Sequence, residues 1–174
     1  TRNYSFLGDR QLAMVIAQTL TVDLLPLSQA SEGYYDTDRT LYFTRLPFQG
    51  SHTKRYHGGS VETLWKFPEG AEEAIPLTAD YTGTSKTPIL HKNRIYFLSD
   101  RDGTMNIWSM TKNGKGVRQH THSSGWDLKG LSNWEGKFVY QKGADLYAWE
   151  IGKKKEQKIE IFLSSDFDQK RKKW

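Results

Sequence analysis

The sequence predicts an all-β fold made of β-propeller blades, and two observations support this. Similar residues recur at a spacing of 43 positions: Leu64 and Ile107, Thr78 and Thr121, and Ile95 and Phe138. In addition, short runs of branched and aromatic residues alternate with turns that contain Gly, Asn or Asp, as in antiparallel sheets. A period in the low forties with several short strands in each unit indicates propeller blades. Because one blade is stable only against its neighbours, the chain is expected to form part of a ring.

The clearest unit lies within residues 84–125, with strands expected at 94–99, 105–110 and 117–121. The turn between the first two strands consists of Asp100, Arg101, Asp102 and Gly103. Glycine readily adopts positive φ, and aspartate side chains accept hydrogen bonds from nearby backbone N–H groups. We therefore interpret these four residues as a structural turn. The alternative is that the two carboxylates form an acid–base pair.

The units on either side repeat this pattern. The following unit, 126–164, has strands expected at 137–141, 144–149 and 158–163. The preceding unit, 32–83, has strands expected at 40–44, 63–67 and 74–78. A poorer, partial unit occupies 1–31, with strands expected at 12–17 and 21–27. The sequence thus predicts about three clear four-stranded blades plus a partial one.

One hairpin departs from the regular spacing. Leu41 and Ile95 are 54 residues apart, so 11 residues are inserted, and they fall within 46–61. An insertion in a repeat protein maps to a loop on one face, where function often resides. The cationic residues of this region are Arg45, His52, Lys54, Arg55 and His57. Because arginine binds carboxylates through two parallel hydrogen bonds, we predict a cationic lip that binds peptides or another domain. A solvated loop is the alternative.

The net charge of +5 does not indicate a nucleic-acid partner. Residues 153–174 contain eight Lys or Arg and four Asp or Glu, so +4 of the +5 falls in this segment. A nucleic-acid-binding domain would instead gather basic residues on one folded face. No apolar run is long enough to span a membrane, so no membrane partner is expected. The 174 residues lack cysteine, which excludes disulfides and thiol catalysis within them. We expect a cytoplasmic location, with a periplasmic or exported one as the alternative.

Two further groups of residues contain the residue types of a metal site or a catalytic site. His120 and His122 would lie on one face of a strand, but two ligands are too few for a zinc site. Asp127 and neighbouring serines supply the residue types of a serine triad, but no Gly-x-Ser-x-Gly elbow is present. We therefore predict no metal, no cofactor and no catalytic residue in this chain.

Several motifs resemble one known family. The segment 97–110, Phe-Leu-Ser-Asp-Arg-Asp-Gly-Thr-Met-Asn-Ile-Trp-Ser-Met, resembles the blade motif shared by tricorn protease and TolB-type propellers. Segments 41–56, 76–81 and 143–146 resemble tricorn-type serine peptidases more specifically. The segment 165–174, which begins Ser-Asp-Phe-Asp-Gln, resembles the exit from the first propeller of that family. The resemblance covers about residues 32–174.

The resemblance implies that the chain is the later part of a six-bladed propeller. In this family a seven-bladed propeller, a PDZ-like domain and a C-terminal serine-protease domain follow. The expected function is therefore non-catalytic: the propeller gates or channels peptides and contacts other domains or subunits of the parent peptidase. None of the family's catalytic residues maps onto this chain.

Two alternatives remain open at this point. One is a stand-alone TolB-like protein-binding propeller without peptidase activity. The other is an enzyme that uses the central funnel, with catalytic residues near 33–38, 84–87 and 126–131. In either case the end blades of an incomplete ring expose unpaired faces, so we expect the isolated piece to self-associate.

Overall fold

The structure is a computed structural model that describes residues 11–46 and 55–162. These residues form 14 β-strands and no helix, so no described segment is a helix that could cross a lipid bilayer. The strands form three four-stranded antiparallel sheets and one two-stranded hairpin. The prediction of an all-β fold built from propeller blades is confirmed.

Each four-stranded sheet is a meander in which consecutive strands pair. The first contains β3 (Ala30–Tyr35), β4 (Leu41–Arg45), β5 (Thr63–Phe67) and β6 (Ile75–Pro76). The second contains β7 (Ser85–His91), β8 (Arg94–Ser99), β9 (Asn106–Thr111) and β10 (Arg118–Gln119). The third contains β11 (Leu128–Trp134), β12 (Lys137–Lys142), β13 (Asp145–Glu150) and β14 (Gln157–Ile159). The hairpin consists of β1 (Ala13–Ile16) and β2 (Thr21–Leu24).

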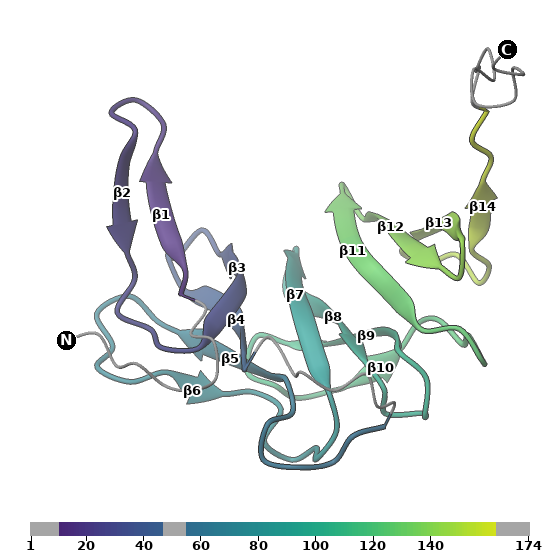
Figure 1. Cartoon of the computed structure of the whole chain (residues 1–174), viewed down its shortest axis with the longest axis horizontal. Coiled ribbons are helices and arrows are strands. Elements are labelled where there is room, and N and C mark those ends of the chain that lie inside the picture. Colours follow the sequence, from purple (N-terminus) through teal and green to yellow (C-terminus); the bar gives the residue numbers. More distant parts are fainter. Residues whose placement is uncertain (1–10, 47–54, 163–174) are drawn as a thin grey trace, which may run out of the picture.

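The three sheets fan out in an arc (Figure 1), with β3, β7 and β11 along its concave side. The sequence pattern picked out three strands in each unit, and the structure adds these innermost strands as the fourth. They lack the regular alternation of apolar and polar residues because each contains a bulge between its two halves.

The residues that recur every 43 positions occupy matching places in successive interblade cores. Leu64 and Ile95 pack in the core between the first and second sheets, and neither is measurably exposed. Ile107 and Phe138 pack in the core between the second and third sheets, and they are equally buried. The repeat in the sequence is therefore a repeat of the contacts that join one blade to the next.

The recurring threonines accept backbone hydrogen bonds in the outer part of each sheet. The Thr78 hydroxyl accepts a hydrogen bond from the Leu64 N–H at 3.0 Å, and the Thr121 hydroxyl accepts one from the Ile107 N–H at 2.8 Å. Both hydroxyls satisfy buried amides at the point where the short outermost strand ends. A buried amide without an acceptor would be costly, which explains why a residue with a side-chain hydroxyl occupies both positions.

The first end of the arc exposes apolar side chains. Leu20, Val22 and Leu24 on the β1–β2 hairpin are 61–76% exposed. A two-stranded hairpin is marginally stable on its own. This exposure is the physical basis for the expectation that the isolated piece self-associates, which stays a prediction.

Replacing Thr121 by valine tests the role of the recurring threonine. Thr121→Val keeps the shape of the side chain but leaves the Ile107 N–H without its acceptor, so we expect local stability to fall by about 2 kcal/mol. Hydrogen–deuterium exchange of the segment 105–111 should then be faster by more than tenfold. Thr121→Ser, which keeps the hydroxyl, is the control. Equal exchange in the two variants would show that the hydroxyl does not hold this strand.

Candidate interaction site at the inner edges of the blades

The innermost strands share a bulge that brings one residue of each into the left-handed region. These residues are Glu32 with φ of 51°, Thr87 with φ of 54° and Gly130 with φ of 61°. Each lies directly after the residue at which the strand register shifts. Bulges bend a strand and redirect a side chain or a backbone group, and they are common next to active sites. The three bulges therefore define the inner edges of the blades as the candidate site.

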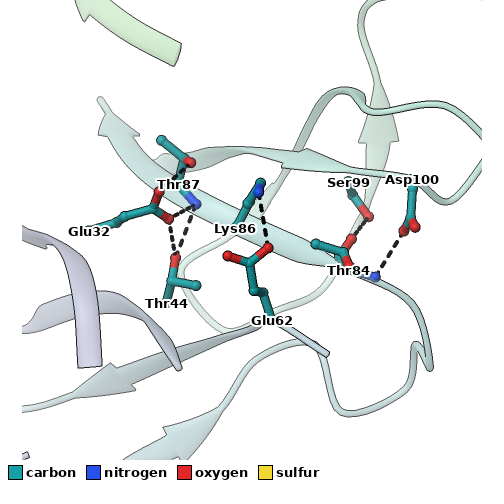
Figure 2. A network of polar contacts seen from close by, with 8 residues as sticks. All are labelled: Glu32, Thr44, Glu62, Thr84, Lys86, Thr87, Ser99 and Asp100. Carbon is teal, nitrogen blue, oxygen red and sulfur yellow. Dashed lines mark hydrogen bonds and ion pairs between the residues drawn. The ribbon is translucent and has the colours of Figure 1, made fainter. Parts of the chain in front are cut away.

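Side-chain contacts hold the first two blades together at this edge (Figure 2). The Glu32 carboxylate accepts hydrogen bonds from the Thr87 backbone N–H at 2.8 Å and from the Thr44 hydroxyl at 2.8 Å. It also accepts a hydrogen bond from the Thr87 hydroxyl at 3.2 Å. A left-handed conformation is costly for residues other than glycine, so Glu32 and Thr87 need such partners. We call this group of contacts the Glu32 clamp.

A buried ion pair lies beside the Glu32 clamp. The Lys86 ammonium is 3.0 Å from the Glu62 carboxylate, and the Glu62 side chain is only 11% exposed. The Ser85 N–H donates to the Glu62 backbone carbonyl at 2.8 Å, which fixes Glu62 against the innermost strand. Removing one member of such a pair would leave the other charge poorly solvated.

A second ion pair joins the same two blades. The Lys112 ammonium donates to the buried Asp36 carboxylate, 76 residues away in the chain. Burial alone would raise the pKa of Asp36, but hydrogen bonds from Lys112 and from the Thr37 N–H outweigh it and lower this pKa. Asp36 therefore stays ionised.

The turn of Asp100, Arg101, Asp102 and Gly103 connects β8 to β9 and lies against Thr84, just before β7. The Asp100 carboxylate accepts hydrogen bonds from the Thr84 N–H and the Tyr81 hydroxyl, both at 2.9 Å. The Asp102 carboxylate accepts one from the Asn106 amide at 3.0 Å. Arg101 stacks over the Tyr81 ring, with its guanidinium carbon 4.4 Å from the ring centroid. These are the contacts of a turn, and its assignment as a purely structural element remains a prediction.

The described part of the insertion packs against the next blade. The Arg55 Nε donates to the Gly103 carbonyl at 2.8 Å, and the His57 ring lies 3.1 Å from the Thr82 hydroxyl. Gly103 has φ of 90°, and a Cβ there would come within 3.0 Å of the Arg55 guanidinium. These contacts tie the insertion to the turn that contains Gly103.

The other cationic residues predicted for the lip are not seen to contact the next blade. The Arg45 guanidinium lies over the Trp65 ring of its own sheet, 4.7 Å from the centroid. His52 and Lys54 lie outside the described residues. The structure therefore brings Arg55 and His57 to the next blade, and binding of peptides by the lip stays a prediction.

A cavity of about 490 Å³ opens between β7 and β11. We call it the inner pocket and define it by its polar and central residues: Lys86, Thr87, Met105, Asp127, Lys129 and Gly130. Sequence reasoning did not assemble this pocket, because its residues come from strands that lacked a clear pattern. The only signal was that the segments 84–87 and 126–131 were expected at inner strand ends.

His120 and His122, the two candidate metal ligands, line one cavity beside Trp149 of the second interblade core. The His120 ring sits 5.0 Å from the Trp149 ring, and its Nε2 is 2.7 Å from the Ser109 hydroxyl. Burial lowers the pKa of His120, and the nearby charge of Arg94 lowers it further. Ser109 is fully buried and its hydroxyl also accepts from the Arg94 guanidinium, so this serine–histidine pair is not presented to a substrate. Within 11–46 and 55–162, no three potential metal ligands cluster.

Comparison with protein families and with known sequences gives a consistent result. A model of the tricorn protease N-terminal β-propeller domain matches residues 1–155. The chain is 30% identical over 118 residues to the tricorn protease of Thermoplasma acidophilum, which is 67% of this chain and 11% of that protein. It is 29% identical over 121 residues to the tricorn protease homolog of Saccharolobus solfataricus, covering 70% and 11%. The chain thus spans about one-tenth of the length of these relatives.

Solved structures show the same likeness. The crystal structure of the tricorn protease superimposes with a TM-score of 0.76 and 27% identity, covering 89% of this chain and 15% of that one. A putative TolB from Agrobacterium tumefaciens gives a TM-score of 0.59 at 15% identity, covering 85% and 59%. The second match shows a shared fold alone.

Removing the Glu32 carboxylate tests the clamp between the first two blades. Glu32→Ala removes a carboxylate that accepts three hydrogen bonds and leaves the Thr44 hydroxyl as the remaining side-chain acceptor of the Thr87 N–H, so we expect a loss of about 2 kcal/mol at this interface. Exchange of the segment 85–91 should become faster in the variant. Glu69→Ala is the matched control, because Glu69 pairs with Arg39 on the exposed surface. We expect that control to cost less than about 1 kcal/mol. Similar effects of the two substitutions would contradict a special role for Glu32.

Lowering the pH tests the half-buried His120. Because the pKa of His120 is lowered in the folded state, the unfolded state takes up the proton first as the pH falls through about 6.5. The free energy of unfolding contributed by neutral His120 is therefore full above this pH and declines below it. Urea denaturation followed by tryptophan fluorescence should show a smaller decline in His120→Gln. An unchanged pH dependence in that variant would rule out His120 as the titrating group.

Proposed function

Because the chain belongs to the family of tricorn protease N-terminal β-propeller domains, we propose that it helps to guide peptides to or from a serine-peptidase site elsewhere in the full-length protein. In this proposal the chain itself is non-catalytic, and the protein acts in the cytoplasm. The observation that supports the proposal best is the arrangement of the inner edges. Between the second and third sheets they form a pocket lined by both charged and apolar residues, and firm contacts join the second sheet to the first.

The charges of the inner edges suit a passing peptide. Lys86 and Lys129 line the inner pocket together with Glu32 and Asp127, so both signs of charge are present. The apolar side chains of Leu98, Leu128 and Leu131 complete the lining. Mixed polar and apolar walls can contact a peptide backbone and its side chains without a strong preference for one sequence. This composition favours transient peptide contact over tight binding of one specific ligand.

Rigid blades are a second requirement of a channel. The Glu32 clamp, the Lys86–Glu62 pair and the Lys112–Asp36 pair all connect the first two described blades. The Arg55 contact adds a further connection between the insertion and the second blade. We propose that these contacts keep the inner edge open at a fixed width. The exposed apolar hairpin β1–β2 is proposed to contact another part of the parent protein.

A bulky label at the inner edge tests this function in the full-length protein. Ser132 is exposed on β11, next to the bulge, and the 174 residues contain no cysteine. In Ser132→Cys, coupling to a polyethylene-glycol maleimide should slow hydrolysis of a short fluorogenic peptide several-fold, whereas N-ethylmaleimide should have little effect. The physical reason is that only the large label obstructs the concave side.

The matched control is Lys115→Cys, in the exposed turn between β9 and β10. The same polymer at this position should leave the rate of hydrolysis unchanged. If both labelled positions give the rate of the unlabelled protein, peptides do not pass the inner edge. If the full-length protein hydrolyses no peptide, the peptidase part of the proposal falls as well.

A further inference from the structure

A second cavity, of about 520 Å³, opens between the second and third sheets, away from their innermost strands. One side is formed by residues of the segment 120–126, which follows β10, and the other by Lys142 and the turn before β14. We call this cavity the outer pocket. Among the described residues it shares no lining residue with the inner pocket, so it is a separate site. Its volume is within the range of small-ligand pockets.

Trp126 gives the outer pocket a flat aromatic surface. This residue is 68% exposed, although tryptophan buries most of its surface in the average protein. Its ring lies against Gly143 in the turn between β12 and β13, where an added Cβ would come 3.5 Å from a ring atom. The Trp126 carbonyl accepts a hydrogen bond from the Ser123 hydroxyl at 2.8 Å, which holds the backbone at this point. A ring supported in this way is a platform on which a planar group can stack.

The outer pocket also has an excess of positive charge. Lys154 and Lys155 are exposed, and within residues 11–46 and 55–162 the structure records no ion pair for either of them. Glu156 is the one acid among the described lining residues, and it already pairs with Lys142 and accepts a hydrogen bond from the Tyr140 hydroxyl. The two remaining lysines therefore attract an anion from solution. Phosphate is a common partner of the lysine ammonium in such sites.

We propose that the outer pocket binds a nucleotide, with its base stacked on the Trp126 ring and its phosphate groups held by Lys154 and Lys155. A nucleotide joins a planar aromatic group to an anion, and these are the two features that the pocket recognises. His122 and Ser124, which are exposed in the same lining, provide hydrogen-bonding groups for the ribose. This site goes beyond the guiding function and does not depend on it.

The distribution of charge favours a free nucleotide over a strand of nucleic acid. A protein that binds single strands needs a positive groove that follows the backbone, with several aromatic rings for successive bases. Only +1 of the net charge of +5 lies in residues 1–152, and the unpaired lysines of the outer pocket lie together in one turn. Among the described residues Trp126 is the one exposed tryptophan of this pocket. The pocket therefore suits one base and its phosphates.

Photo-crosslinking of the full-length protein with azido-ATP tests the site directly. Mass spectrometry should locate the adducts in the segments 120–126 and 142–156, which contain the lining of the outer pocket. Unlabelled ATP should prevent labelling at a concentration roughly tenfold or more below that required of adenosine or of inorganic tripolyphosphate. The reason is that adenosine lacks the phosphates and tripolyphosphate lacks the base, so each loses one of the two contacts.

Two variants with matched controls examine the residues that form the site. Trp126→Ala should reduce labelling about tenfold through loss of stacking, whereas Trp134→Ala removes a tryptophan that is 77% exposed outside the pocket and should have no effect. Lys154→Glu should reduce labelling about tenfold, since attraction of phosphate becomes repulsion. Lys115→Glu makes the same change of charge in another exposed turn and should leave labelling unchanged. All four positions are exposed, so these changes should not unfold the blades.

Several results would overturn the nucleotide site. Adducts outside the outer pocket, or labelling that Trp126→Ala leaves unchanged, would remove its basis. Equal competition by tripolyphosphate and ATP would reduce the pocket to a patch that attracts any anion. Competition by a single-stranded oligonucleotide or by oligoglutamate at far lower concentrations than by ATP would assign the surface to nucleic acid or to an acidic protein instead. The bulky label at Ser132→Cys lies on β11 outside this pocket, so its effect on hydrolysis is judged separately.

Discussion

Burial of both faces of each blade is the constraint on which this structure depends. Leu64 and Ile95 fill one interblade core, and Ile107 and Phe138 fill the next in the same positions. Four-stranded sheets of this size have two apolar faces, so each sheet is stable only between neighbours. The arc in Figure 1 follows directly, and so does the exposure of Leu20 and its neighbours on the hairpin at its first end.

The interblade cores fix the spacing of the blades, so the side chains at the inner edges can differ from one blade to the next. The backbone repeats a bulge in β3, β7 and β11, yet the residues at the left-handed position are Glu32, Thr87 and Gly130. In the first case the side chain closes the interface by accepting the amide of the next blade. At the next interface the residue that corresponds to Glu32 is Thr87, which has no carboxylate, and a pocket remains. A repeated backbone geometry with different side chains therefore closes one interface and leaves a pocket at the next.

Much of the fold could be predicted from the sequence because its outer three strands obey simple rules. The segment 94–99 coincides with β8, since it is rich in β-formers and ends at a strong turn. The innermost strands could not be recognised with the same ease. Pro88 and Gly130 interrupt their patterns, and each bulge shifts the alternation by one residue. The inner pocket was hidden for the same reason, because its lining depends on the register of these strands.

The insertion shows a different limit of sequence reasoning. Its length identified it as unusual, and its cations suggested binding of carboxylates. The structure places the Arg55 guanidinium on the Gly103 carbonyl, a partner 48 residues away that no local pattern could indicate. In the sequence, the positive φ that a turn requires is reason enough for Gly103. In the structure, its lack of a side chain also makes room for Arg55. The same glycine therefore serves the turn and the contact between blades, which links the insertion to the geometry of the propeller.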